Sequence, residues 1–240
     1  MKKVVISLVV VGASLFPLAG AAAQSAKPAT LAGLTPAKVV ALAMSGARQE
    51  GSCLDVSKGA AVGYTFDATT QSGTDEAHQD MSFNSSRGTA VLIKGRLYIR
   101  ESATLISLQF GRSDPQWANR WVYIPSSSAD YHSLATGLVF SSMISQVPPA
   151  PPLRATAVET LDGHKVVAVI GTANAELGLT KGVETLFVSA TSPFLPVQLR
   201  ASGRTQGVPT TLVVTFSHWG QRYRFATPSG ATPLASTTLP

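Results

Sequence analysis

The sequence predicts a mainly β fold of the α+β class, with one antiparallel sheet and a few helices. Hydrophobic residues make up 45% of the chain and charged residues 13%, which supplies a core and is too little charge for a disordered chain. β-Branched and aromatic residues gather in short segments bounded by Gly, Pro and Ser, as strands require. The clearest such stretch is 181–220, where three consecutive strands are predicted over 182–190, 195–201 and 210–219.

Residues 1–23 are predicted to form a secretory signal peptide. Lys2 and Lys3 precede a short apolar run, and alanines at 21–23 supply the small residues that a signal peptidase needs. The apolar run is too short for a membrane-spanning helix. We therefore expect cleavage after Ala23 and an exported protein of the periplasm, cell envelope or medium.

The chain has one cysteine, Cys53, which lies far downstream of the predicted cleavage point. The residues before it, Glu50, Gly51 and Ser52, do not form the apolar run that precedes a lipidated cysteine, so no lipid anchor is expected. A single cysteine also excludes an internal disulfide. We interpret Cys53 as a small buried hydrophobe in a first strand, with a reactive or intermolecular thiol as the alternative.

The charge balance is mildly basic. Removing the two lysines of the signal peptide from the 19 basic residues leaves 17 against 13 acidic residues, a net charge of +4. These basic residues are scattered, without a run that would follow a phosphate backbone, so no nucleic-acid partner is expected. Transient contact with an anionic membrane surface or with envelope proteins stays open.

One domain is predicted over residues 34–226. It follows a polar linker at 24–33 and precedes a tail at 227–240, which lacks periodicity and is expected to be disordered. The domain should begin with a helix over 34–48, in which Thr35 is the N-cap and a proline takes the first helical position.

The remaining elements follow from the hydrophobic pattern. A long, bulged strand is expected over 52–66, then a hairpin loop at 69–75 and strands over 77–84, 88–94 and 96–100. Helices are expected over 102–110 and 131–146, on either side of a short strand within 117–125. A proline run at 148–152 is interpreted as a rigid connector, with a proline-motif ligand as the alternative; strands over 153–161 and 164–171 follow it.

Trp117 and Trp121 lie four residues apart. We interpret them as core residues beside an entrance to the fold. The alternative is a stacking platform for a sugar or a base.

No catalytic, metal or cofactor motif is found. The histidines, His78, His132, His164 and His218, are isolated from one another in the sequence. Zinc sites require clustered ligands, and the chain has no nucleophile elbow, phosphate loop or dinucleotide fingerprint. A non-enzymatic protein without cofactors is therefore expected, and a Ser/His/Asp triad assembled only in space is the enzymatic alternative.

The order of the elements resembles that of the LolA/LolB-like periplasmic lipoprotein-carrier superfamily, and within it the LppX and LprG type of envelope lipid carriers. The resemblance covers about residues 34–226 and depends on the order and spacing of short motifs. These motifs are Gly59 to Phe66, Val91 to Tyr98, Trp121 to Pro125, Leu161 to His164, Glu184 to Val188, Pro196 to Leu199 and Val214 to Gly220.

This resemblance implies a strongly curved antiparallel half-barrel whose concave face is covered by helices and holds acyl chains. The expected role is an exported carrier or chaperone for a lipid, lipoglycan or acylated protein. Apolar residues of the predicted strands and helices are the candidate lining of the cavity: Val62, Tyr64, Phe66, Met81, Phe83, Val91, Ile93, Leu97, Ile99, Leu105, Leu138, Phe187 and Phe216.

The chain departs from these carriers in two respects. The LppX and LprG types are usually lipid-anchored, which is not expected here, and no equivalent of the arginine that holds the lid of LolA can be assigned. A non-enzymatic interaction, sensor or adaptor module with the same fold is therefore the alternative function.

Overall fold

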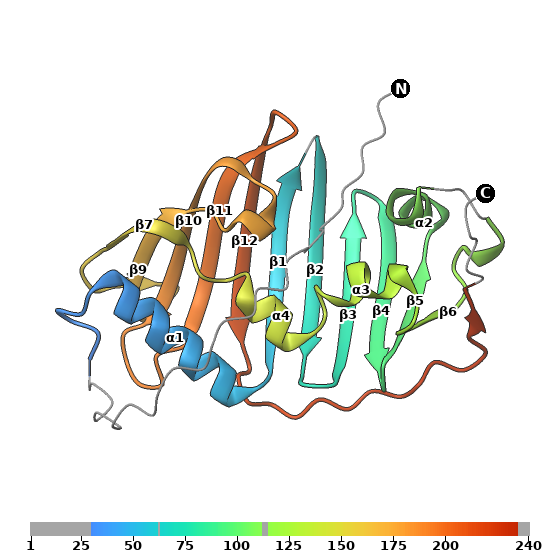
Figure 1. Cartoon of the computed structure of the whole chain (residues 1–240), viewed down its shortest axis with the longest axis horizontal. Helices are drawn as coiled ribbons and strands as arrows, with labels where there is room; N and C mark the ends of the chain where they lie inside the picture. The colour runs from blue at the N-terminus through green and yellow to red at the C-terminus, as the bar shows by residue number, and fades with distance from the viewer. Residues whose placement is uncertain (1–29, 62, 112–114, 235–240) are drawn as a thin grey trace.

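The computed structural model describes residues 30–61, 63–111 and 115–234. In this part of the chain a single thirteen-stranded sheet is curved but not closed into a barrel (Figure 1). The order along the sheet is β13-β6-β5-β4-β3-β2-β1-β12-β11-β10-β9-β7, and the short strand β8 pairs with β9. The predicted mainly β half-barrel is confirmed. The signal peptide lies outside the described residues.

The strands are antiparallel to their neighbours except for β13, which pairs with β6 in parallel. Their bounds are β1 Cys53–Ala61, β2 Tyr64–Ser72, β3 Glu76–Phe83, β4 Ser86–Ile93, β5 Arg96–Glu101, β6 Val122–Pro125, β7 Ala150–Ala155, β8 Glu159–Leu161, β9 His164–Thr172, β10 Thr180–Ser189, β11 Pro196–Thr205, β12 Val208–Ser217 and β13 Thr232–Pro233.

The helices cover one face of the sheet (Figure 1). Their bounds are α1 Pro36–Glu50, α2 Ala103–Phe110, α3 Ala129–Ala135 and α4 Phe140–Ser145, with single 3-10 turns η1 Pro115–Trp117 and η2 Ala175–Leu177. Helix α1 begins as predicted, because the Thr35 side chain accepts a hydrogen bond from the Lys38 amide and Pro36 occupies the first turn. It ends at Gly51, whose φ of 71° is the left-handed conformation that glycine adopts without strain.

Two hydrophobic cores lie between the helices and the two flanks of the sheet. Helices α1 and α4 pack over β9, β10 and β11, where Leu186, Ile144 and Val169 are fully buried. On the other flank, α2 and α3 pack near β4, β5 and β6, and Leu97 and Ile124 are buried there. The central strands β12, β1, β2 and β3 lie between these two cores.

Tight hairpin turns connect consecutive antiparallel strands of the sheet. At the β4–β5 turn Lys94 and Gly95 have φ of 50° and 70°, and at the β11–β12 turn Gln206 and Gly207 have φ of 51° and 82°. Two consecutive residues with positive φ match the right-handed twist of the flanking strands. The break expected between the strands over 88–94 and 96–100 is therefore confirmed as a turn. Strand β11 continues beyond the predicted end at residue 201, and β12 begins and ends two residues earlier than the strand predicted over 210–219.

Strand β2 continues to Ser72, into the loop expected at 69–75, and β7 begins within the proline run, so that the strand expected over 153–161 is divided into β7 and β8. Two further elements differ from their predictions. The long strand expected over 52–66 is a hairpin of β1 and β2, which reverses beside Gly63 (φ 77°) and brings Ala61 opposite Tyr64. Apolar alternation continues on both sides of this turn, so the pattern hides the reversal. The helix expected over 131–146 is two helices, because the Leu138 and Val139 amides both bond the Ala135 carbonyl in a turn that contains a glycine.

The chain after β12 is ordered further than predicted. It runs along one end of the strands to the far edge of the sheet, where β13 forms (Figure 1). The amides of Thr232 and Leu234 bond the carbonyls of Trp121 and Tyr123, and Leu234 enters the α2–α3 core. Residues 227–234 are thus not a disordered tail, because β6 offers them an unpaired edge and a buried apolar site. Residues 235–240 lie outside the described part.

Candidate functional site

Strand pairing fixes which side chains share the helix-covered face. Residues directly opposite each other in antiparallel strands point to the same side. Leu212 of β12, Gly59 of β1, Phe66 of β2 and Phe83 of β3 are successive partners in one row across the centre. Leu212 packs against the α1 core, so the whole row faces the helices.

A partly exposed apolar surface covers the central strands on this face. We define the central apolar surface by its six larger side chains: Tyr64, Phe66, Met81, Phe83, Leu212 and Val214. All six are half-buried, whereas the residues of the two flanking cores are buried. Leu212 and Val214 pack at the edge of the α1 core, and Met81 packs at the edge of the α2–α3 core. The strip is therefore continuous with both cores but less buried than either.

The strip is formed by close contacts between side chains and backbone. The rings of Tyr64 and Phe83 stack with centroids 4.9 Å apart. Phe66 lies directly over Gly59, because a Cβ on that glycine would come within 2.7 Å of the Phe66 ring. Glycine at this position therefore allows the aromatic ring to lie close against β1.

The connection between α3 and α4 covers the other end of the same strands. The Ser72 hydroxyl, fully buried on β2, donates a 3.1 Å hydrogen bond to the Leu138 carbonyl. Leu138 itself is buried in the α2–α3 core. The helical layer is thereby attached to the central strands at one end.

The predicted lining residues fall into two groups. Nine lie on the helix-covered face or in the helices above it: Tyr64, Phe66, Met81, Phe83, Leu97, Ile99, Leu105, Leu138 and Phe216. Of these, the first four belong to the central apolar surface and the other five are buried in the flanks. Val62 lies outside the described residues.

Three predicted lining residues have the opposite orientation. Val91 and Ile93 of β4 pack with Tyr98 on the far face, and Phe187 packs there with Val166. The apolar runs 90–93 and 186–188 are buried on both faces, so alternation carries no information about which residue faces the helices. The C-terminal segment covers the far side of β4 through Phe225, and the Arg200 guanidinium lies 5.0 Å from the Phe187 ring centroid.

Leu212 and Val214 complete the central surface and were absent from the predicted lining. Both share the alternation of β12 with Phe216, which was predicted. The alternation along β12 could have identified them, because Val213 and Thr215, which lie between Leu212, Val214 and Phe216, are exposed. Counting two and four residues back from Phe216 along the strand identifies Val214 and Leu212.

Three buried carboxylates also face the helices: Asp55, Glu101 and Glu184. Burial raises the pKa of Asp55 to about 6 and that of Glu101 and Glu184 to about 7. Ser57 donates a hydrogen bond to Asp55, and the Asn174 amide donates one to Glu184. These bonds favour the charged form and partly offset the effect of burial. The sequence pattern did not indicate this set.

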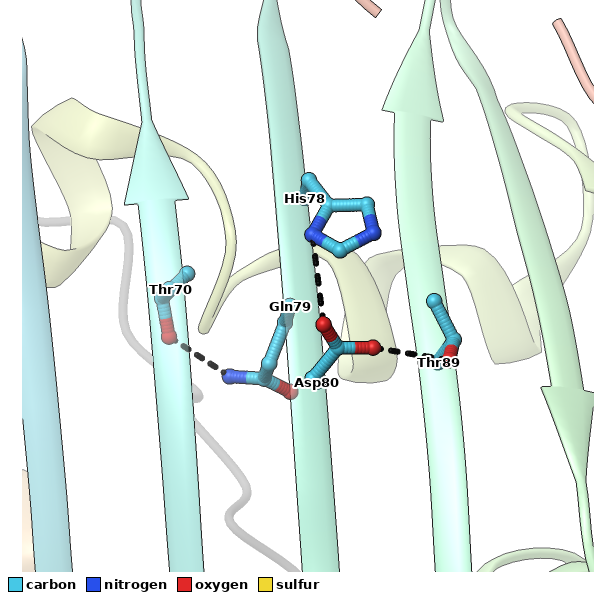
Figure 2. A network of polar contacts seen from close by, with 5 residues as sticks. All are labelled: Thr70, His78, Gln79, Asp80 and Thr89. Atoms are coloured by element: carbon cyan, nitrogen blue, oxygen red, sulfur yellow. Dashed lines mark hydrogen bonds and ion pairs between the residues drawn. The ribbon is translucent and has the colours of Figure 1, made fainter.

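His78 belongs to a polar network that joins β2, β3 and β4. Figure 2 shows His78 beside Asp80, whose carboxylate also accepts a 2.9 Å hydrogen bond from Thr89, while Gln79 points the other way and donates to Thr70. The His78–Asp80 contact is 3.9 Å long and Asp80 is 65% exposed. No serine or cysteine belongs to this network, so it is a cross-strand polar contact on the surface.

Neither a metal site nor a reactive thiol appears in the part of the chain that the structure describes. No cluster of three His, Cys, Asp or Glu side chains is placed to hold an ion there. Cys53 is completely buried, and burial raises the pKa of its thiol, which confirms its interpretation as a small buried hydrophobe. The helices among these residues are too short or too polar to span a membrane.

Comparison with known proteins identifies solved structures that have a similar fold. No protein-family model matches the sequence, and no curated protein matches it. Two solved structures have the same fold over most of the chain. The lipoprotein LppX of Mycobacterium tuberculosis is 13% identical with a TM-score of 0.51, covering 79% of this chain and 99% of LppX. LprF of Mycobacterium bovis is 14% identical with a TM-score of 0.51, covering 81% and 97%.

These similarities define the class of fold as the open, helix-covered half-barrel of LppX and LprF. The resemblance seen in the sequence is confirmed at this level. At 13% and 14% identity, the comparison concerns the fold. Function has to be argued from the site.

Proposed function

We propose that this protein is an exported carrier or chaperone that binds the acyl chains of a lipid, lipoglycan or acylated protein on the central apolar surface. One observation carries the proposal: six apolar side chains on the helix-covered face are only half-buried, between two cores of buried residues. The similarity in fold to LppX and LprF supports it.

The physical argument concerns the cost of leaving this strip in water. Each methylene group of an acyl chain that leaves water contributes about 0.8 kcal/mol. Aromatic rings such as Phe66 and Phe83 offer flat apolar area for such a chain, and a surface rimmed by packed helices fixes its direction. Binding requires no catalytic group, metal or cofactor.

The proposed carrier role also implies where in the cell the protein acts. The predicted signal peptide supports export, and the net positive charge supports transient contact with anionic membranes, where a carrier would load or release its ligand. We expect the protein to act in the periplasm or cell envelope without a lipid anchor.

Two adjacent valines of β12 allow a matched test. Val214 belongs to the central apolar surface, whereas Val213 is 36% exposed on the opposite face. Val214→Ser should weaken binding of the fluorescent fatty acid cis-parinarate by about tenfold, because a polar group replaces apolar contact area. Val213→Ser should leave the affinity unchanged. The measurement is a fluorescence titration of the full mature chain.

Native mass spectrometry of protein purified under mild conditions provides the second readout. We expect a bound lipid on the wild type and less of it on Val214→Ser. A lipid-free wild type that also fails to bind cis-parinarate would overturn the proposal, and equal weakening by both valine variants would contradict the assigned surface. A stable protein partner with no lipid would instead favour the adaptor alternative.

A further inference from the structure

A second candidate site lies at the β6 edge of the sheet, away from the central apolar surface. It is a cleft of about 450 Å³, within the range of roughly 300–1,000 Å³ typical of small-ligand sites. Its walls come from β5, η1 and the turn after it, the start of β6, and the C-terminal segment. The lining residues are Arg100, Gln116, Trp117, Asn119, Arg120, Trp121, Val122, Ser229, Gly230 and Thr232.

The cleft opens on the face away from the helices. Arg100 lies between Ile99 and Glu101 on β5, and both of those side chains face the helix-covered core. Trp121 packs with Tyr98 on the far face. A ligand held by Arg100 and Trp121 would therefore not compete with an acyl chain on the central surface.

The charge of the cleft is positive. Arg100 and Arg120 are both exposed, and neither forms an ion pair with a carboxylate among the residues that the structure describes. Glu101, which follows Arg100 in the sequence, has its side chain buried on the other face. Two guanidinium groups in one cleft favour an anion, because each can donate two parallel hydrogen bonds to a carboxylate or phosphate.

The aromatic residues add a second kind of recognition. The Trp121 indole is half-buried, and the Arg100 guanidinium lies 5.1 Å from its ring centroid, which orients the arginine at the cleft. Indole rings can stack against the apolar C–H face of a sugar ring. The side-chain amide of Asn119 and the hydroxyl of Ser229 can bond sugar hydroxyl groups.

The walls are held in place by the C-terminal segment. The Thr232 amide donates a 3.2 Å hydrogen bond to the Trp121 carbonyl, and the Asn119 amide donates a 2.7 Å bond to the Glu101 carbonyl. Leu234, 8% exposed, anchors the segment in the core. The turns that line the cleft are thus attached to paired strands at Arg100, Val122 and Thr232, which hold them in place.

From this combination we propose that the cleft binds an acidic saccharide, namely a sugar ring that carries a carboxylate or a phosphate. Arg100 and Arg120 bind the acid group, and Trp121 stacks on the ring. This proposal does not depend on acyl-chain binding at the central apolar surface.

The test uses glucuronate and the full mature chain, with the indole N–H signals of the tryptophans as the NMR readout. Arg120→Gln and Arg100→Gln should each weaken glucuronate binding about tenfold, the loss expected for one charge-assisted contact. Arg154→Gln is the matched control, because Arg154 is exposed on β7 at the opposite edge. Val214→Ser should bind glucuronate normally, which separates the two proposed sites.

Two further probes decide the chemistry. Glucose and acetate should each bind far more weakly than glucuronate. Equal binding of acetate would overturn the role of the sugar, and equal binding of glucose would overturn that of the charge. Equal weakening by Arg154→Gln and Arg120→Gln would reduce the effect to overall charge and overturn the site.

Vesicles distinguish the source of the saccharide. Phosphatidylcholine vesicles that contain phosphatidylinositol, whose cyclic polyol phosphate is an analogue of a sugar phosphate, should compete with glucuronate if the ligand is a lipid headgroup. Vesicles with phosphatidylglycerol carry the same charge without a ring and serve as the control. Competition by the phosphatidylinositol vesicles alone supports a headgroup, absence of competition by either supports a free saccharide, and equal competition by both contradicts ring recognition.

Discussion

The flanks and the centre of the sheet differ in how many of their faces are covered. In the flanks, helices cover one face, and the C-terminal segment or neighbouring strand residues cover the other, so β4 and β10 carry apolar residues on both sides. In the centre, β2 and β12 alternate residues that are at least half-buried with exposed ones, most of which are polar. We infer that the flanks contribute most of the stability of the fold and that the centre is available to bind a ligand.

A large-to-small change in a flank should show this division most strongly. Leu186 is fully buried under α1, so Leu186→Ala should lower the free energy of unfolding by about 2–5 kcal/mol through lost transfer energy and a cavity. Urea unfolding followed by tryptophan fluorescence measures this. Affinity for cis-parinarate should not change under conditions where the variant is folded.

Val183→Ala on the same strand is the control, because Val183 is 49% exposed and should change the free energy of unfolding by less than about 0.5 kcal/mol. A large loss of fatty-acid affinity in Leu186→Ala would contradict the division between packed flank and ligand-binding centre.

The same difference explains how much of the fold the sequence predicted. Hairpins with a distinct turn signal, such as Lys94–Gly95, and the capped start of α1 at Thr35 were predictable from local chemistry. The β1–β2 reversal beside Gly63 was not, because apolar alternation continues on both sides of it. The order at Leu234 was not predictable either, since it depends on an unpaired edge of β6, more than a hundred residues earlier in the chain.

The orientation of the site residues was likewise predictable only where the sequence pattern distinguishes the two faces of a strand. Tyr64, Phe66 and Phe83 were placed on the correct face because one side of β2 and β3 is polar and alternation therefore has a direction. Val91 and Phe187 were misplaced because their strands are apolar on both faces. When both faces of a strand are buried, apolar and polar residues do not alternate along it. Which residue faces the helices is then decided by contacts that form only in the folded chain.

Glu101 provides a pH-dependent test of the α2–α3 flank. Its side chain is 2% exposed, and burial raises its pKa from 4.5 to about 7. The folded state therefore binds this proton more tightly than the unfolded state does. The stabilising contribution is complete below about pH 4.5 and is lost as the pH rises through 7.

Glu101→Gln removes that titration. At pH 8 the variant should be more stable than the wild type by about 1–3 kcal/mol, and near pH 4 the two should be equal. Chemical unfolding at a series of pH values measures the difference. Glu159→Gln, an exposed change on β8, should show no such trend, and a pH-independent difference for Glu101→Gln would contradict burial of the charge.

The smallest expected effect concerns the attachment of the helical layer to the centre. Ser72→Ala removes the hydrogen bond from the buried Ser72 hydroxyl to the Leu138 carbonyl, so the free energy of unfolding should fall by about 1 kcal/mol. Because this bond holds the α3–α4 connection over the central strands, its loss should also speed the uptake of cis-parinarate in stopped-flow fluorescence. Ser133→Ala, an exposed change within α3, should alter neither quantity. Unchanged uptake in Ser72→Ala, with the expected loss of stability, would show that a ligand reaches the central surface without movement of this connection.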